Sequence, residues 1–120
     1  KTWGAAAVKV NGNAAGAATS LTPYIAVELW SKRVFVAWQD YRNGSHGDVY
    51  FNFSLDNGKT WNVPDYRMDE SKPAGAANAR APQLYVSPQR VGAVWIDNRT
   101  PYGGNHKTGA NADIYSSWAK

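Results

Sequence analysis

Short apolar runs separated by polar, turn-forming residues extend along the whole chain of 120 residues. The runs at 34–38 and 91–96 are apolar on both faces, which is typical of strands in a sheet covered on both sides. Residues 49–53 alternate instead, with Val and Phe at one set of positions and Tyr and Asn at the other. The Ala-rich stretch 14–18 is short and broken by Gly, and no segment keeps a helical period. The pattern predicts an all-β protein.

The sequence contains an internal repeat. Four short matches occur in the same order in both halves of the chain. They are separated by 58, 59, 57 and 65 residues, so the second copy carries about eight extra loop residues. The single segment 1–120 therefore divides into repeat 1, about 1–58, and repeat 2, about 59–120. The matched pairs are Lys1-Thr2-Trp3 with Lys59-Thr60-Trp61, Gly16-Ala17-Ala18 with Gly75-Ala76-Ala77, 36–42 with 93–99, and Asp48-Val49-Tyr50 with Asp113-Ile114-Tyr115.

Each copy is predicted to form four short strands. Labelled A to D within a copy, the chain supplies strand D, then A to D, then A to C. This amounts to two four-stranded units, one of them split between the two ends of the chain. The eight expected strands are 5–10, 23–28, 33–39, 48–53, 63–69, 83–86, 91–96 and 113–118.

A strong turn follows the alternating run 48–53. In Ser54-Leu55-Asp56-Asn57-Gly58-Lys59-Thr60-Trp61, Asn and Gly tolerate left-handed backbone angles. The Asp56 carboxylate can accept hydrogen bonds from backbone N–H groups within the turn, and the hydroxyls of Ser54 and Thr60 can add local bonds. Trp61 can fold back as an apolar plug. The chemistry predicts a turn that satisfies its own polar groups.

The spelling Ser-x-Asp-x-Gly-x-Thr-Trp, with Ser54, Asp56, Gly58, Thr60 and Trp61 in the signature positions, resembles the Asp-box of sialidases, the bacterial neuraminidase repeat. The resemblance implies a sialidase-like β-propeller, in which the box is a structural turn remote from the catalytic face. Sialidases have six blades, so three copies of this chain would close a ring as a homo-oligomer. Alternatively, further blades belong to a longer chain.

Composition narrows the range of partners. The net charge of +4 comes from scattered Lys and Arg rather than a basic cluster, so nucleic acid is not an expected partner. No apolar run has the length of a membrane span, and no secretory signal is present. The absence of Cys excludes disulfides and thiolate metal sites. Neither His46 nor His106 has metal-ligand spacing, which argues against zinc, and no Asp-rich loop has a recognisable run of calcium ligands. Neither a metal nor a cofactor is therefore expected.

Alternating strands place the loops 11–22, 41–47, 70–81 and 98–112 on one rim, where binding residues usually lie. Arg42 and Arg99 recur in both copies. They either bind a ligand carboxylate or form an ion pair with an Asp of their own unit. The second interpretation is favoured because the Asp-x-Arg pattern occurs in both copies. Tyr41 and Arg80 break the symmetry of the repeat and are better ligand-binding candidates. The longest loop adds Tyr102 and His106, in a composition that suits a sugar or a loop without a role.

No catalytic residue is predicted. By resemblance, a sialidase needs three Arg, a Tyr paired with Glu, and an Asp acid/base, and this chain has only two Glu. The expected function is therefore a non-catalytic, extracellular or secreted propeller module that binds glycan or another surface ligand at its loop rim. One alternative is a segment of an exo-sialidase, a glycoside hydrolase that shares its catalytic residues with other blades. Another is a scaffold for protein–protein interaction.

Overall fold

The structure, a computed structural model, describes residues 6–70, 72–99 and 112–119. Within these ranges it contains only strands and turns, so the all-β prediction is confirmed. The same ranges hold no helix long and apolar enough to cross a bilayer. The strands are β1 (Ser20–Glu28), β2 (Arg33–Asp40), β3 (Asp48–Ser54), β4 (Tyr66–Arg67), β5 (Ala79–Ser87), β6 (Arg90–Asp97) and β7 (Asp113–Ala119).

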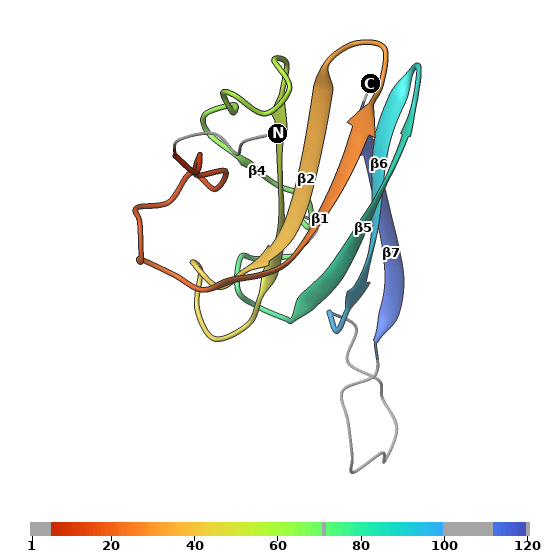
Figure 1. Cartoon of the computed structure of the whole chain (residues 1–120). Coiled ribbons are helices and arrows are strands. Elements are labelled where there is room, and N and C mark those ends of the chain that lie inside the picture. The colour runs from red at the N-terminus through yellow and green to blue at the C-terminus, as the bar shows by residue number, and fades with distance from the viewer. Residues whose placement is uncertain (1–5, 71, 100–111, 120) are drawn as a thin grey trace, which may run out of the picture.

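The strands form two antiparallel sheets that pack against each other. One sheet has the order β1-β2-β3-β4 and the other the order β5-β6-β7. In Figure 1 β1, in orange, lies beside β5, in green, and β5 is the strand of the second sheet that contacts β1, β2 and β3. Neighbours in each sheet are consecutive in the chain, as expected for strands joined by short turns.

The first three strands of each sheet are built alike. Asp40 pairs with Asp48 in the first sheet, and Asp97 pairs with Asp113 in the second. The register of β1 with β2 shifts between Leu21 and Tyr24, and that of β5 with β6 shifts between Arg80 and Gln83. The residues inside these two irregularities, Thr22 and Ala81, have positive φ angles of 48° and 51°.

The main core lies between the two sheets. The first sheet contributes aromatic and small side chains, and the second contributes Leu84, Ala93 and Trp95. The opposite face of the first sheet carries a smaller cluster, on which Val10 and Trp61 pack. The residues of the first sheet are Phe35, Ala37, Val49 and Phe51 in the main core and Val36, Trp38 and Tyr50 in the smaller cluster.

Two predicted strands differ from the structure, and the described residues form seven strands rather than eight. Residues 6–10 are not a strand, because they lie across a sheet face, where the Val10 carbonyl accepts a hydrogen bond of 2.8 Å from Asn52 Nδ2. The red segment in Figure 1 shows this course. The predicted strand 63–69 shortens to β4, since Pro64 has no N–H to donate and Asp65 turns its side chain toward Arg42.

The antiparallel order separates the connections into two groups. We call the end formed by 11–19, 41–47, 70–78 and 98–99 the loop end, and the end formed by 29–32, 55–60 and 88–89 the turn end. The candidate binding residues that the structure describes, Tyr41, Arg42, Arg80 and Arg99, lie at the loop end, whereas the Ser54–Trp61 turn lies at the other.

Candidate functional site

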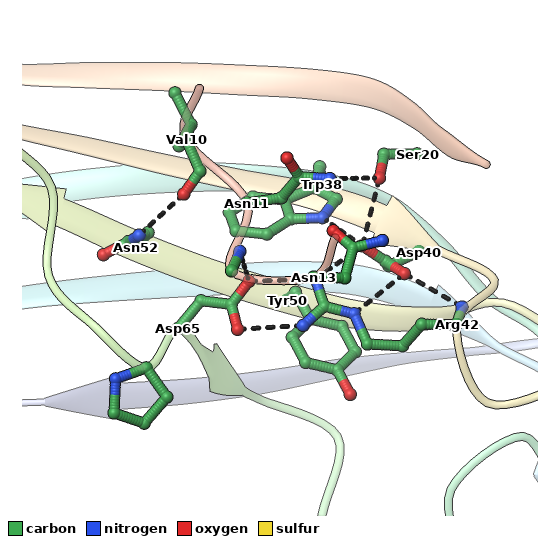
Figure 2. A network of polar contacts seen from close by, with 12 residues as sticks. Val10, Asn11, Asn13, Ser20, Trp38, Asp40, Arg42, Tyr50, Asn52 and Asp65 are labelled. Atoms are coloured by element: carbon green, nitrogen blue, oxygen red, sulfur yellow. Dashed lines mark hydrogen bonds and ion pairs between the residues drawn. The ribbon is translucent and has the colours of Figure 1, made fainter. Parts of the chain in front are cut away.

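Arg42 is held by the carboxylate of Asp40, the last residue of β2 (Figure 2). Asp40 Oδ1 accepts hydrogen bonds from the backbone N–H of Arg42 at 2.9 Å and from its Nε at 3.0 Å. Asp40 Oδ2 accepts from Arg42 Nη2 at 2.7 Å and from Trp38 Nε1 at 2.8 Å. Arg42, which recurs as Arg99 in the second copy of the repeat, is therefore bound within its own sheet.

A second carboxylate completes the surroundings of Arg42. Asp65 accepts from Nη1 and Nη2, both at 2.9 Å, and also from the backbone N–H of Gly12 at 2.8 Å. The guanidinium carbon lies 3.9 Å from the centre of the Tyr50 ring, a cation–π distance. With two carboxylates and a ring around it, Arg42 has little capacity left for a ligand carboxylate.

These contacts shift the pKa values of Asp40 and Arg42 in the directions that favour the charged pair. Burial opposes ionisation of Asp40, but the hydrogen bonds from Arg42 and Trp38 outweigh it and lower the pKa of the carboxyl. Burial likewise disfavours the charged guanidinium, and the bonds to Asp40 and Asp65 raise the pKa of Arg42. Asp40 therefore stays ionised at neutral pH.

The second sheet repeats this unit with one carboxylate instead of two among the described residues. Asp97 Oδ1 accepts from the backbone N–H of Arg99 at 2.8 Å, and Asp97 Oδ2 accepts from Arg99 Nη2 at 2.6 Å and from Trp95 Nε1 at 3.2 Å. The guanidinium lies 4.0 Å from the centre of the Tyr115 ring. Hydrogen bonding to Asp97 raises the pKa of Arg99, and Arg99 and Trp95 lower the pKa of Asp97 against the effect of burial. Among the described residues, Arg99 Nε has no hydrogen-bond partner.

The two arginines do not converge on one point. Arg42 lies over Tyr50, on the face of the first sheet turned away from β5–β7. Arg99 lies over Tyr115, which packs against the core between the sheets. Arg42 and Arg99 therefore do not bind one ligand carboxylate together in this arrangement. Each arginine stabilises the loop that follows its own strand.

A chain of hydrogen bonds across the two sheets connects Tyr41 indirectly to Arg80. Gln39 Nε2 donates to the Tyr41 hydroxyl at 3.0 Å and to Asn78 Oδ1 at 2.9 Å. The Asn78 carbonyl accepts from the backbone N–H of Asn98 at 3.1 Å, and Arg80 Nη1 donates to Asn98 Oδ1 at 2.6 Å. Tyr41, Asn78 and Arg80 are half-buried, so each presents part of its surface at the loop end.

Sequence reasoning missed the residues that hold this site in place. Asn78 Oδ1 also accepts from Gly47 N at 3.0 Å, and Lys72 Nζ lies 3.1 Å from Asp48 and 3.0 Å from Asp69. Burial raises the pKa of Asp69, although Lys72 acts in the opposite direction. Gly47 and Asn78 are 31 positions apart and Asp48 and Lys72 are 24 apart, so the spacing of these two pairs carries no signal; Asp69 and Lys72 are three positions apart. The only hint is that polar residues interrupt the Gly- and Ala-rich loop 70–78.

The other predicted site residues give no further group. Tyr102 and His106 lie outside the described residues. In the ranges 6–70, 72–99 and 112–119, no three His, Cys, Asp or Glu side chains gather closely enough to hold a metal ion.

The turn at the opposite end has the closed set of hydrogen bonds expected from its sequence. Asp56 Oδ1 accepts from Ser54 Oγ at 2.7 Å and from Thr60 N at 2.9 Å, and Asp56 Oδ2 accepts from Thr60 Oγ1 at 2.7 Å. The bonds from Thr60 N, Ser54 and the Thr60 hydroxyl lower the pKa of Asp56 to about 2. Asn57 and Gly58 take positive φ angles of 62° and 82°, and Trp61 packs on the smaller apolar cluster. The turn therefore satisfies its own polar groups.

Comparison with known proteins adds no relative. No protein-family model, curated protein or solved structure matches the chain.

Proposed function

We propose that this chain is a non-catalytic segment of a sialidase-like β-propeller that binds a glycan at its loop end. The propeller arrangement is supported by the matching registers of the two sheets and by the polar turn between β3 and β4. In this proposal each sheet is one blade. The observation that carries the binding function is the chain of hydrogen bonds that joins Tyr41 to Arg80 across the two sheets.

The chemistry at this junction suits sugar hydroxyls. Tyr41 supplies an aromatic ring and a hydroxyl, Asn78 an amide, and Arg80 a planar set of N–H donors. These groups are mutually oriented by hydrogen bonds before any ligand arrives, which reduces the entropy lost on binding. The loops 41–47 and 70–78 are fixed against each other by the hydrogen bond from Ala79 N to the Gly47 carbonyl, at 2.6 Å.

The state of the buried carboxylates supports a non-catalytic role. A general acid at neutral pH needs a pKa raised toward the working pH. Asp40 and Asp97 instead have lowered pKa values, because Arg42 and Arg99 bind them in the ionised form. A secreted or extracellular setting, where glycans are displayed, is part of this proposal.

Binding can be tested with immobilised oligosaccharides, followed by calorimetry with each glycan that is retained. Tyr41→Ala and Arg80→Ala are each expected to weaken binding by about tenfold or more, equivalent to roughly 1.4 kcal/mol. Arg90→Ala is a matched control, since Arg90 is exposed at the turn end and its loss changes the net charge by the same amount as Arg80→Ala. Absence of binding to every glycan, or an equal effect of the control, contradicts the proposal. Hydrolysis of a fluorogenic sialoside by the chain contradicts its non-catalytic part.

A further inference from the structure

The two sheets pack head to tail, with different faces in contact. Each sheet has a tryptophan face, which carries Trp38 in the first sheet and Trp95 in the second, and a back face on the other side. The core between the sheets contains Trp95 and Leu84 from the second sheet, together with Ala37 and Val49 from the first. The tryptophan face of the second sheet therefore lies on the back face of the first.

Within the part of the chain that the structure describes, head-to-tail packing leaves one face of each kind without a sheet on it. On the tryptophan face of the first sheet, Ile25 is 60% exposed and Val27 48%. On the back face of the second sheet, Tyr85 is 49% exposed, Val94 36% and Ile114 71%. Each of these faces presents neighbouring apolar side chains on regular strands.

The exposed residues are the repeat equivalents of residues buried between the sheets. Ile25 and Val27 correspond to Leu84 and Val86, which lie 59 positions later and pack in the core. Tyr85, Val94 and Ile114 correspond to Ala26, Ala37 and Val49 on the opposite side of that core. The chain therefore carries both halves of a second interface of the kind it has already formed once.

The segment that covers the first sheet leaves this interface accessible. Val10 and Trp61 pack over Val36, Trp38 and Tyr50, on β2 and β3. In the interface within the chain, it is β5 that contacts β1, β2 and β3 (Figure 1). The strand equivalent to β5 is β1, where Ile25 and Val27 remain exposed.

We propose that copies of this chain associate head to tail, with β1 of one copy packing on the back face of β5–β7 of the next. Such a contact joins two different surfaces, so association continues until a ring closes or a filament forms. Exposed apolar sheet faces of this kind are costly in water, and each contact between two copies buries one face of each kind. The inference rests on the propeller arrangement proposed above, but its readout is mass rather than glycan binding.

The test uses sedimentation velocity and native mass spectrometry of the whole chain. The unmodified chain is expected as a defined oligomer, whereas Ile25→Asp and Ile114→Asp are each expected as monomers. Each variant keeps one intact face, so an equimolar mixture is expected to form a one-to-one pair that cannot extend. This complementation distinguishes head-to-tail contact from a contact of one surface with itself.

Leu29→Asp serves as the control, because Leu29 is 85% exposed in the β1–β2 turn, outside the strands that form both faces. It is expected to leave the oligomer intact. Circular dichroism verifies that each variant is folded, and Val27→Asp and Val94→Asp replace any variant that is not. A monomeric unmodified chain, monomers in the mixture, or dissociation of the control overturns the inference. Glycan binding by a chain that stays monomeric leaves the proposed function standing while overturning this one.

Discussion

At the scale of single residues, the two sheets differ in how well they satisfy the same buried pair. Asp40 and Asp97 are both fully buried, and the side chains of their partners Arg42 and Arg99 are 17% and 12% exposed. Arg42 has Asp65 as a second carboxylate, whereas Arg99 has only Asp97 among the described residues. Removing the carboxylate of Asp97 therefore leaves Arg99 less well compensated than removing the carboxylate of Asp40 leaves Arg42.

Asp97→Asn is expected to destabilise the protein more than Asp40→Asn. Loss of one partner of a buried ion pair costs about 3–5 kcal/mol, and this value is expected for Asp97→Asn. About 2 kcal/mol is expected for Asp40→Asn, since Arg42 keeps its bonds to Asp65. Urea unfolding of both variants at neutral pH measures the difference. Equal free energies of unfolding, or the reverse order, contradict this account of the second carboxylate.

Asp56 is expected to make stability depend on pH on the acid side. Hydrogen bonds in the turn lower its pKa from the ordinary value of 3.8 to about 2 in the folded protein. A depressed folded pKa contributes stability that is fully present above about pH 4 and is lost as the pH falls through about 2. Asp56→Asn should therefore lower the urea midpoint at neutral pH and approach the unmodified protein near pH 2. Glu70→Gln, an exposed carboxylate outside the turn, should show no such convergence.

At the scale of elements, the loop end depends on how closely two loops approach. The loop 70–78 brings Gly75 against the loop 41–47, where a Cβ on Gly75 would lie 2.4 Å from the carbonyl oxygen of Asn43. Gly75 N also donates to Asp48, at 2.9 Å from Oδ2, and its φ is 67°. Its equivalent, Gly16, has a φ of 73° but nothing within 4 Å of a Cβ.

Gly75→Ala and Gly16→Ala separate backbone strain from steric contact. Both place Ala at positive φ, which is expected to cost about 1 kcal/mol for Gly16→Ala. Gly75→Ala adds a clash with backbone and is expected to cost about 3 kcal/mol. Thermal and urea unfolding measure both. Hydrogen exchange at the amides of 41–47 should increase only for Gly75→Ala, and equal effects of the two variants would contradict a role for the contact between loops.

At the scale of the whole molecule, equivalent positions meet different environments. Leu84 is 8% exposed between the sheets, whereas Ile25, its equivalent in the first sheet, is 60% exposed. The difference arises because the second sheet covers only one face of the first. Apolar burial is thus unequal in two sheets of similar sequence.

Leu84→Ala and Ile25→Ala should differ in how their effects depend on protein concentration. Leu84→Ala leaves a cavity and is expected to cost about 2–5 kcal/mol at any concentration. Ile25→Ala is expected to cost less than about 1 kcal/mol in dilute protein, and more as concentration rises, because association stabilises only the chain that can associate. Unfolding at several protein concentrations measures this. A cost for Ile25→Ala that does not change with concentration contradicts the proposed contact.

The hydrophobic pattern predicted most of the strands, and the reasons for its two failures are physical. Residues 6–10 have strand-like alternation, but the Asn52 amide and the apolar cluster hold Val10 on a sheet face. Of the candidate site, the loops could be predicted because antiparallel strands alternate in direction. The link between Tyr41 and Arg80 could not, since it passes through Gln39 and Asn78, which are 39 positions apart.

The sequence by itself determined most of the strands, the polar turn at Asp56 and the similarity of the two sheets. These depend on interactions within a strand and its next neighbour, which the order of residues specifies directly. Only the tertiary structure decided that Arg42 and Arg99 lie on different sides of the first sheet and that Ile25 is exposed where Leu84 is buried. Packing between sheets sums many weak contacts over whole faces, so no single stretch of sequence specifies which faces meet.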